Sequence, residues 1–379
     1  MGGEDLAKKL KVAVLFGGRS GEHAVSLVSA ASIMQAMDRE RYEIVPVGIT
    51  EEGRWLCGGD PLRALQEKQV PGGCFFASIV TDPPAPGIML WDDAGRSRGF
   101  QRLDVVFPVL HGTYGEDGTV QGLLELAGLP YVGAGVLASA TGMDKAVMKI
   151  LFQAVGLPVP AFLYFNDSDW RSEAEEIAGE IEKKLLYPCF VKPANAGSSV
   201  GISKVTSREM LFRGIDTALR YDHKVIVEAN VQGREIECSV LGNEEPIVSV
   251  PGEIIPGAEF YDYRAKYIDN CARLLIPAAL PADVVERLQD YAIRAFQAVE
   301  CSGLARIDFF YEEKIGRIYV NEINTLPGFT EISMYPKLWA ASGIPFGMLI
   351  DKLIEFALER HRRRQRLVTR WETPPEGAE

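Results

Sequence analysis

The chain has 379 residues, 47% of them hydrophobic and 24% charged, with a formal net charge of −12 at pH 7. This length predicts two or three domains that each bury a core, and the composition is that of an ordinary globular protein. The acidic balance argues against a general nucleic-acid-binding protein, and no apolar stretch is long enough to span a membrane. The six cysteines contain no C-x-x-C pair, so we expect reduced thiols and a cytoplasmic protein.

The N-terminal part predicts a doubly wound parallel sheet. A strand, a glycine-containing turn at 17–23 and a helical pattern over 24–37 form an opening βα unit. The turn lacks the G-x-G-x-x-G spacing, which argues against a nicotinamide dehydrogenase. Residues 51–100 show no clear period and are expected to be irregular. Buried strands are expected over residues 11–16, 42–49 and 104–110.

Polar residues 111–119 follow the third of these strands, at the edge where open α/β sheets bind ligands. His111 and Glu116 could contact a substrate there or cap the helix expected from Val120, and for either residue alone the cap is favoured. Residues 133–142 are expected to form a hinge that leads out of this first domain.

A Gly/Ser loop at 194–201 follows a strand that carries Lys192. Small residues let backbone N–H groups approach an anion, although such a loop is more often a hairpin turn, and the Walker spacing is absent. Glu228 lies on another expected strand, over 224–231. Helices are expected over residues 144–155, 170–186, 207–221, 282–301 and 344–361, and further strands over 157–165, 235–241 and 248–256.

Residues 303–330 predict a β-hairpin with Gly316 near the end of its turn. A three-residue loop over 314–316 would place Asp308 opposite Glu322 and Arg306 opposite Asn324. All four side chains would then share one face of the hairpin. Facing carboxylates repel unless they are neutralised, and this set of oxygen donors suits Mg²⁺. The alternative is a polar face that simply meets water.

Seven motifs in order resemble those of the D-alanine–D-alanine ligases of the ATP-grasp superfamily, over nearly the whole chain. They are GGRSGEHAVS (17–26), LHGTYGEDGTVQG (110–122), MDK (143–145), VKPANAGSSVGISKV (191–205), YDYRAKY (261–267), LARIDFF (304–310) and NEINTLPGFTEISMYP (321–336). The resemblance implies a three-domain ATP-grasp fold: an N-terminal α/β domain at 1–140, a central subdomain at 141–230 and a C-terminal subdomain at 231–366. Residues 367–379 are expected to be a disordered tail.

The resemblance also implies ATP-dependent ligation of two D-alanine molecules through a D-alanyl phosphate, in a homodimer that supplies peptidoglycan synthesis. The residues that correspond to ATP contacts are Lys145, Lys192, Ser199, Glu228, Val231, Glu235 and Lys266. Those that correspond to ligands of two Mg²⁺ ions, with Mn²⁺ as an alternative, are Asp308, Glu322 and Asn324. The corresponding catalytic and substrate residues are Glu22, Val25, His111, Ser198, Tyr267, Arg306, Gly328, Ser333 and Met334.

One departure from the family pattern is Ala24, since many members carry an acid at this position. Met334 is apolar where relatives that use other acceptors tend to carry a basic residue, which favours D-alanine as the second substrate. Another ATP-grasp ligase, with a D-serine or D-lactate acceptor, remains an alternative. A nucleotide-binding regulatory module without turnover is a further alternative, and the full set of metal and phosphate residues argues against it.

Overall fold

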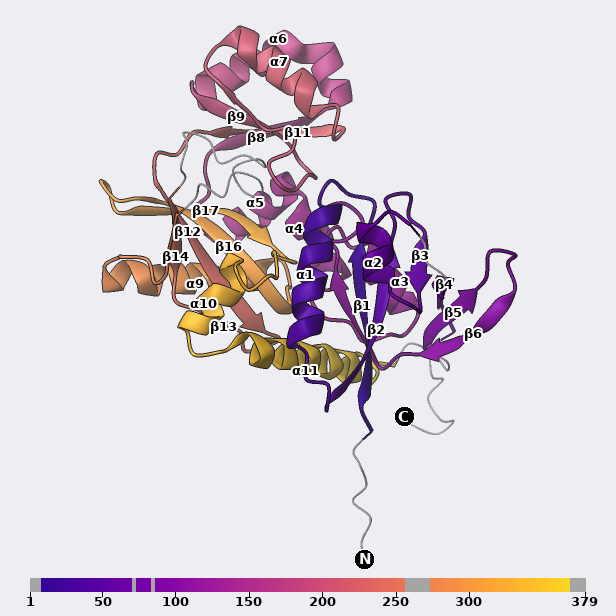
Figure 1. The fold of residues 1–379 in the computed structure, drawn as a ribbon. Helices are drawn as coiled ribbons and strands as arrows, with labels where there is room; N and C mark the ends of the chain where they lie inside the picture. Colours follow the sequence, from indigo (N-terminus) through magenta and orange to yellow (C-terminus); the bar gives the residue numbers. More distant parts are fainter. Residues whose placement is uncertain (1–7, 70–72, 83–85, 256–272, 369–379) are drawn as a thin grey trace, which may run out of the picture.

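The computed structural model describes residues 8–69, 73–82, 86–255 and 273–368. Within these residues the strands form sheets of seven, four and six strands. Figure 1 shows the four-stranded sheet, with helices α6 (Asp167–Lys184) and α7 (Arg208–Ala218), set apart above the other two sheets. Helix α11 (Phe346–Arg364) runs beneath both of the lower sheets and connects them. Within the described part of the chain, no helix is both long and apolar enough to cross a membrane.

The N-terminal sheet has a parallel part and an antiparallel extension. Its order is β6-β5-β4-β3-β2-β1-β7, in which β2-β1-β7 are parallel and the other neighbours antiparallel. The expectation that residues 51–100 are irregular is therefore wrong. These strands are short and β6 is mostly exposed, so they carry no regular alternation. The strands are β1 (Leu10–Gly17), β2 (Tyr42–Ile49), β3 (Trp55–Cys57), β4 (Phe75–Val80), β5 (Gly87–Trp91), β6 (Ser97–Arg102) and β7 (Val105–Val109).

Helices cover both faces of the parallel part, as expected for a doubly wound sheet. Val12 and Val14 of β1 pack in one core with α1 (His23–Ala36) and α11 (Phe346–Arg364). Ala13 and Leu15 point to the other face and pack in a second core with α3 (Thr119–Leu126). The alternation of a strand thus divides β1 between two cores. The short helix α2 (Pro61–Gln66) begins at Asp60, whose side chain accepts a hydrogen bond from the Arg63 amide.

The central sheet is antiparallel, in the order β10-β9-β11-β8. Val191, Val225 and Val227 pack beneath its two helices, whereas Lys192 and Glu228 alternate to the opposite face. The strands are β8 (Phe162–Asn166), β9 (Cys189–Pro193), β10 (Ser203–Val205) and β11 (Lys224–Ala229), and the helices are α6 (Asp167–Lys184) and α7 (Arg208–Ala218). The face of this sheet that carries Lys192 and Glu228 is therefore opposite to the face that packs against α6 and α7.

The C-terminal sheet carries the predicted hairpin and packs against helices on both sides. Residues 133–142 were expected to form a hinge. Residues 136–142 instead form most of helix α4, in which Ala138 and Gly142 are buried. The strands are β12 (Arg234–Gly242), β13 (Ile247–Val248), β14 (Gly252–Ile255), β15 (Arg273–Leu275), β16 (Gly303–Glu312) and β17 (Arg317–Asn324). The helices are α4 (Val136–Met143), α5 (Lys145–Ala154), α9 (Ala282–Ala298) and α10 (Met334–Ala341).

The register predicted for the hairpin is confirmed at its polar end: Arg306 pairs with Asn324, and Asp308 pairs with Glu322. The loop length is wrong, because Glu312 pairs with Arg317 and four residues connect the strands. A β-bulge after Asp308 compensates for the extra loop residue, which restores the predicted pairing. Gly316 has a φ of +65°, the left-handed conformation that the turn requires.

Candidate functional site

A cavity of about 620 Å³ lies where strands of the C-terminal sheet meet loops and a helix that belong to the other two sheets. It is bordered by α1, by the loop after β7, by the Gly/Ser loop after β9, and by the hairpin strands β16 and β17. The predicted site residues that line it are Glu22, Val25, His111, Lys145, Ser198, Ser199, Arg306, Glu322, Asn324, Gly328, Ser333 and Met334. Segments 294 positions apart in the chain, 22–28 and 322–334, thus border one space.

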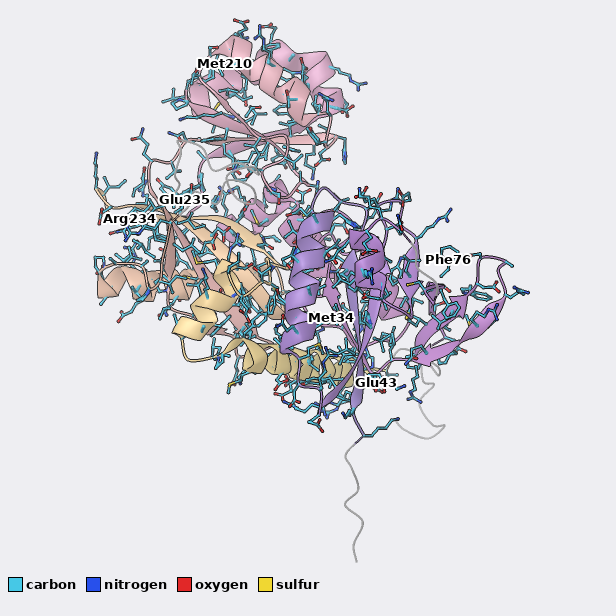
Figure 2. All side chains as sticks on the ribbon, viewed as in Figure 1. Met34, Glu43, Phe76, Met210, Arg234 and Glu235 are labelled. Atoms are coloured by element: carbon cyan, nitrogen blue, oxygen red, sulfur yellow. The ribbon has the colours of Figure 1, made fainter. Side chains whose placement is uncertain are left out.

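Other predicted residues lie beside this cavity or outside the described part of the chain. Asp308 accepts a hydrogen bond from Arg306, which lines the cavity. Lys192 and Glu228 form an ion pair with each other, next to Lys149. Val231 and Glu235 lie at the connection into β12, and Figure 2 labels Arg234 and Glu235 at the end of β12 nearest the central sheet. Lys266, Tyr267 and the tail from 369 onward are outside the described residues.

Glu22 is buried at the start of α1, where the Ser198 hydroxyl donates a hydrogen bond to its carboxylate. A Cβ atom added to Gly197 would lie 3.1 Å from Oε2 of Glu22, and one added to Gly112 would lie 2.8 Å from it. Glycine at these two positions therefore lets two loops close tightly around a single carboxylate. A buried carboxylate held in this way can bind the ammonium group of an amino acid.

His111 and Glu116 face Glu22 in the cavity, so the interpretation of either as a helix cap is wrong. The cap residue of α3 is Gly118, and Asp117 accepts hydrogen bonds from the Tyr114 and Thr119 amides. His111 Nδ1 lies 3.1 Å from the carbonyl oxygen of Leu326 and 3.7 Å from Oε1 of Glu116.

The acidic neighbours of His111 control its charge. Burial acts to lower the pKa of His111, but Glu116 and Glu22 outweigh it and raise that pKa above its ordinary value. Burial, together with the charge on Glu22, raises the pKa of Glu116, and His111 acts against this. The three groups thus form a site that favours cationic partners.

Arg306 is held by two carboxylates on neighbouring strands. Its Nε and Nη2 atoms donate to the two oxygens of Asp308, both at 2.7 Å, and Nε lies 3.1 Å from Oε2 of Glu237 on β12. Burial acts to lower the pKa of Arg306, but Asp308 and Glu237 keep it well above its ordinary value. The repulsion expected between Asp308 and Glu322 is therefore offset by a guanidinium group in this structure.

A cluster of buried lysines lies between α5 and the central sheet. Lys192 Nζ is 2.7 Å from Oε2 of Glu228, and Lys149 Nζ is 3.2 Å from Oε1. Lys145 donates to the carbonyl oxygen of Ala196, in the Gly/Ser loop, at 2.6 Å. Lys149 was not among the residues predicted from the sequence, although it lies on the same face of α5 as Lys145, four positions away.

The pKa values within this cluster follow from burial and charge. Burial, together with the charge on Lys192, lowers the pKa of Lys145, and Glu322 acts against this. For Lys192, Glu228 and Glu322 outweigh burial and raise the pKa. Burial acts to raise the pKa of Glu228, but Lys149 and Lys192 bring it down to about 2. Three lysines around one buried glutamate leave a surplus of positive charge, which suits a polyphosphate.

Ser198 and Ser199 both have positive φ angles, of 49° and 58°. This left-handed conformation is unfavourable for residues other than glycine and is common where a loop contacts a ligand. Because it follows Lys192 and reaches Glu22, the loop connects the lysine cluster to the carboxylate of α1. The segment joins the antiparallel strands β9 and β10, so the expectation of a hairpin turn is confirmed, and its contacts with Lys145 and Glu22 also make it a wall of the cavity.

The donor set of the hairpin fits a divalent cation. Two carboxylates, Asp308 and Glu322, and the Asn324 amide oxygen lie within one bulged ladder, with Glu237 opposite Asp308 on β12. Such hard oxygen donors suit Mg²⁺. Among the residues that the structure describes, no cluster of three or more His, Cys, Asp or Glu side chains has a metal-binding arrangement. Asn324 and non-protein oxygens would have to complete the coordination.

Comparison with known proteins identifies the family. The protein-family model described as "D-ala D-ala ligase N-terminus" matches residues 11–134, and the family model described as "D-ala D-ala ligase C-terminus" matches residues 151–355. The chain belongs to the D-alanine–D-alanine ligase family. The resemblance seen in the seven sequence motifs is thereby confirmed.

Curated members of this family are similar to the chain over nearly its whole length. The D-alanine–D-alanine ligase of Natranaerobius thermophilus is 51% identical over 359 residues, which cover 95% of this chain and 98% of that relative. The enzyme of Heliobacterium modesticaldum is 52% identical over 363 residues, with the same coverage of both chains.

Solved structures of the family confirm the predicted fold class. The D-alanine–D-alanine ligase of Coxiella burnetii superposes with a TM-score of 0.82 at 38% identity, covering 95% of this chain and 97% of that chain. VanG D-Ala:D-Ser ligase from Enterococcus faecalis also gives a TM-score of 0.82, at 37% identity, with 92% and 100% coverage. The mixed α/β architecture described above is thus that of the ATP-grasp ligases.

Proposed function

We propose that the chain joins two D-alanine molecules to D-alanyl-D-alanine with ATP, through a D-alanyl phosphate, and so supplies peptidoglycan synthesis. The observation that carries this proposal is the cavity itself, which is lined by both a carboxylate, Glu22, and a guanidinium group, Arg306. A carboxylate is a poor electrophile, so it is first activated by attack on the γ-phosphate of ATP. The amine of the second D-alanine then displaces the phosphate.

The residues proposed for the phosphoryl transfer act mainly through charge and alignment. Lys145 and Lys192 neutralise the phosphates of ATP, with Ser199, Glu228, Val231, Glu235 and Lys266 as further nucleotide contacts. Asp308, Glu322 and Asn324 hold two Mg²⁺ ions, or Mn²⁺, which supply neutralisation of the charge on the transferring phosphate. Arg306 faces the acyl phosphate, because its side chain lines the cavity beside Glu322. Preorganised charge of this kind is the main source of rate enhancement in such a transfer.

The residues proposed for the two amino acids line the rest of the cavity. Glu22 binds the ammonium group of the first D-alanine, and Ser198, Val25, His111 and Tyr267 border the same substrate. Gly328, Ser333 and Met334 border the second D-alanine. Met334 is buried against Ile254 and Leu338, an apolar surface that suits a methyl group.

The proposal extends to domain organisation and assembly. The chain divides at about residues 140 and 230, as expected from the motifs, and forms a cytoplasmic homodimer. The division is supported by two cores that each draw on one part of the chain, residues 13–131 beneath α3 and residues 163–229 of the central sheet. Light scattering of the full chain tests the dimer.

The decisive experiment is a phosphate-release assay with ATP and Mg²⁺, in which D-alanine is compared with L-alanine, D-serine and D-lactate. Release with D-alanine, and D-alanyl-D-alanine as the product by mass spectrometry, is the expected result. D-serine is the most informative competitor, because one similar structure is a D-Ala:D-Ser ligase. A mixed D-Ala-D-Ser product as the main species would overturn the proposed acceptor.

A further inference from the structure

Lys149 on α5 is fully buried, at 1% exposed, although lysine is rarely buried without partners. Its ammonium group donates to the backbone carbonyl oxygen of Asn321 at 2.7 Å and lies 3.2 Å from Oε1 of Glu228. Asn321 belongs to β17 and Glu228 to β11. One buried cation therefore joins the hairpin of the C-terminal sheet to the polar face of the central sheet.

Asn321 is the extra residue of the β-bulge in β17. Phe309 pairs with Val320, whereas Asp308 pairs with Glu322, so Asn321 has no partner in the ladder. In an uninterrupted ladder Asp308 would face Asn321, and Glu322 would move by one position to the opposite face of the sheet. The bulge is therefore what places Glu322 opposite Asp308.

Helix α5 supplies partners for the backbone groups on both sides of Glu322. Lys149 binds the carbonyl oxygen of Asn321, and the sulfur of Met148 accepts a hydrogen bond from the Ile323 amide at 3.3 Å. A bulge leaves backbone polar groups outside the ladder, and a buried group without a partner is costly. These two contacts stabilise the bulged conformation over a regular ladder.

The second partner of Lys149 lies on the nucleotide side of the site. Lys149 and Lys192 hold one oxygen each of Glu228, which is 3% exposed. Lys192 donates a hydrogen bond to one oxygen and Lys149 forms an ion pair at the other, so the rotation of this carboxylate is restricted. The position of Glu228 therefore depends on the same ammonium group that holds the bulge.

We propose that Lys149 is a positioning residue: its ammonium group holds the bulge that places Glu322 opposite Asp308, and it fixes Glu228 on the nucleotide side. This inference rests on the proposed function, in which Asp308 and Glu322 bind Mg²⁺ and Glu228 contacts ATP. Lys149 acts on both groups through intermediates, because its contacts are a backbone carbonyl and a carboxylate inside the protein.

Hydrogen exchange of the metal-free, full-length protein tests the bulge directly. In Lys149→Met, which keeps the length of the side chain and removes the donor, amides of β17 should exchange about ten- to a hundredfold faster. Amides of β12, on the other side of β16, should be unchanged. The matched control is Lys224→Met, because Lys224 pairs with Asp144, the N-cap residue of the same helix. This control should leave β17 exchange as in the wild type.

A second measurement follows the effect on the metal. The Mg²⁺ concentration that gives half-maximal ADP binding, measured by calorimetry, should rise about 10–100-fold in Lys149→Met, as for other residues that orient metal ligands. Lys149→Gln keeps a donor for Asn321 without the charge, so its β17 exchange should lie between wild type and Lys149→Met. If the Met variant does not fold, Lys149→Gln carries the test.

Wild-type exchange in β17 and wild-type Mg²⁺ dependence, in a folded Lys149 variant, would overturn the positioning role. Because the exchange is measured without substrates, it is independent of the ligase assay. A wild-type protein that releases no phosphate with D-alanine would overturn the proposed function, and the exchange result would still decide whether Lys149 holds the bulge.

Discussion

The Ser198 hydroxyl donates a hydrogen bond to the Glu22 carboxylate across 176 positions of the chain. Ser198 makes this contact from a left-handed conformation, with a φ of 49°. Such a conformation costs free energy and persists only when surrounding contacts compensate. The contact therefore connects the Gly/Ser loop of the central sheet to the first helix, and it closes one side of the cavity.

Gly197→Ala tests whether the position of Glu22 determines amino-acid binding. The new Cβ would lie 3.1 Å from Oε2 of Glu22, so the carboxylate has to shift by a few tenths of an ångström. We expect the KM for D-alanine to rise on the order of tenfold, since small displacements in a site have large kinetic effects, with little change in the KM for ATP.

The control for this variant is Gly122→Ala on α3, where an added Cβ would meet nothing within 4 Å. It should stabilise the helix by about 0.5–1 kcal/mol and leave both KM values unchanged. An unchanged KM for D-alanine in Gly197→Ala would contradict the role of Glu22.

Asp308→Asn removes one of the two carboxylates that hold Arg306. The variant should lose phosphate release by on the order of 10²–10³, because a metal ligand and the alignment of Arg306 are both affected. It should also lower the stability by about 1–3 kcal/mol, since one buried charge-assisted pair is lost. Steady-state kinetics and thermal unfolding measure the two effects. Asp290→Asn is a suitable control, because Asp290 pairs with Arg294 on the exposed face of α9.

Lys192→Ala removes a charge next to the proposed phosphate site. We expect weaker ATP binding and a rate reduced by ~10²–10³, the usual cost of losing one preorganised electrostatic donor. Glu228 would keep Lys149 as a partner, so the protein should still fold. Nucleotide binding and single-turnover kinetics separate the two effects, and unchanged values for both would place Lys192 outside the nucleotide site.

Acid should destabilise the protein partly through Glu228. Although burial acts to raise it, the pKa of Glu228 in the folded protein is about 2, because of Lys149 and Lys192. This value is below the pKa of a glutamate in an unfolded chain, about 4.3. The ionised Glu228 therefore stabilises the folded protein fully above about pH 4.3, and this stabilisation is lost as the pH falls toward 2. In that window the free energy of unfolding should fall by up to about 1.4 kcal/mol per pH unit from this group.

Urea unfolding between about pH 5 and pH 3 measures this dependence. Glu228→Gln should remove the contribution and be less stable at neutral pH by about 3–5 kcal/mol, because two buried lysines lose their carboxylate. Glu180→Gln is the control, since Glu180 pairs with Lys184 on an exposed helix face. If the free energy of unfolding of Glu228→Gln changed with pH as steeply as that of the wild type, the low pKa of Glu228 would be contradicted.

The sequence by itself determined the features that are encoded over short distances. The alternation of β16 and β17, with Gly316 in the turn, predicted the hairpin and its polar face, although the pairing of Asp308 with Glu322 also needs the β-bulge that the sequence did not predict. Strand β2 was predicted over the residues that form it, 42–49, because its apolar run is bounded by polar segments. The ordered motifs likewise indicated the family, since each motif is a local string of residues.

Only the tertiary structure decided which groups from distant segments meet. The pairing of Glu228 with Lys149 joins residues 79 positions apart, and no local period predicts that a carboxylate will lie between two lysines. For His111 and Glu116 the sequence favoured a helix cap, and only the fold placed them beside Glu22. The bulge at Asn321 likewise has a distant partner, because Lys149 of α5 donates a hydrogen bond to the carbonyl oxygen of its extra residue.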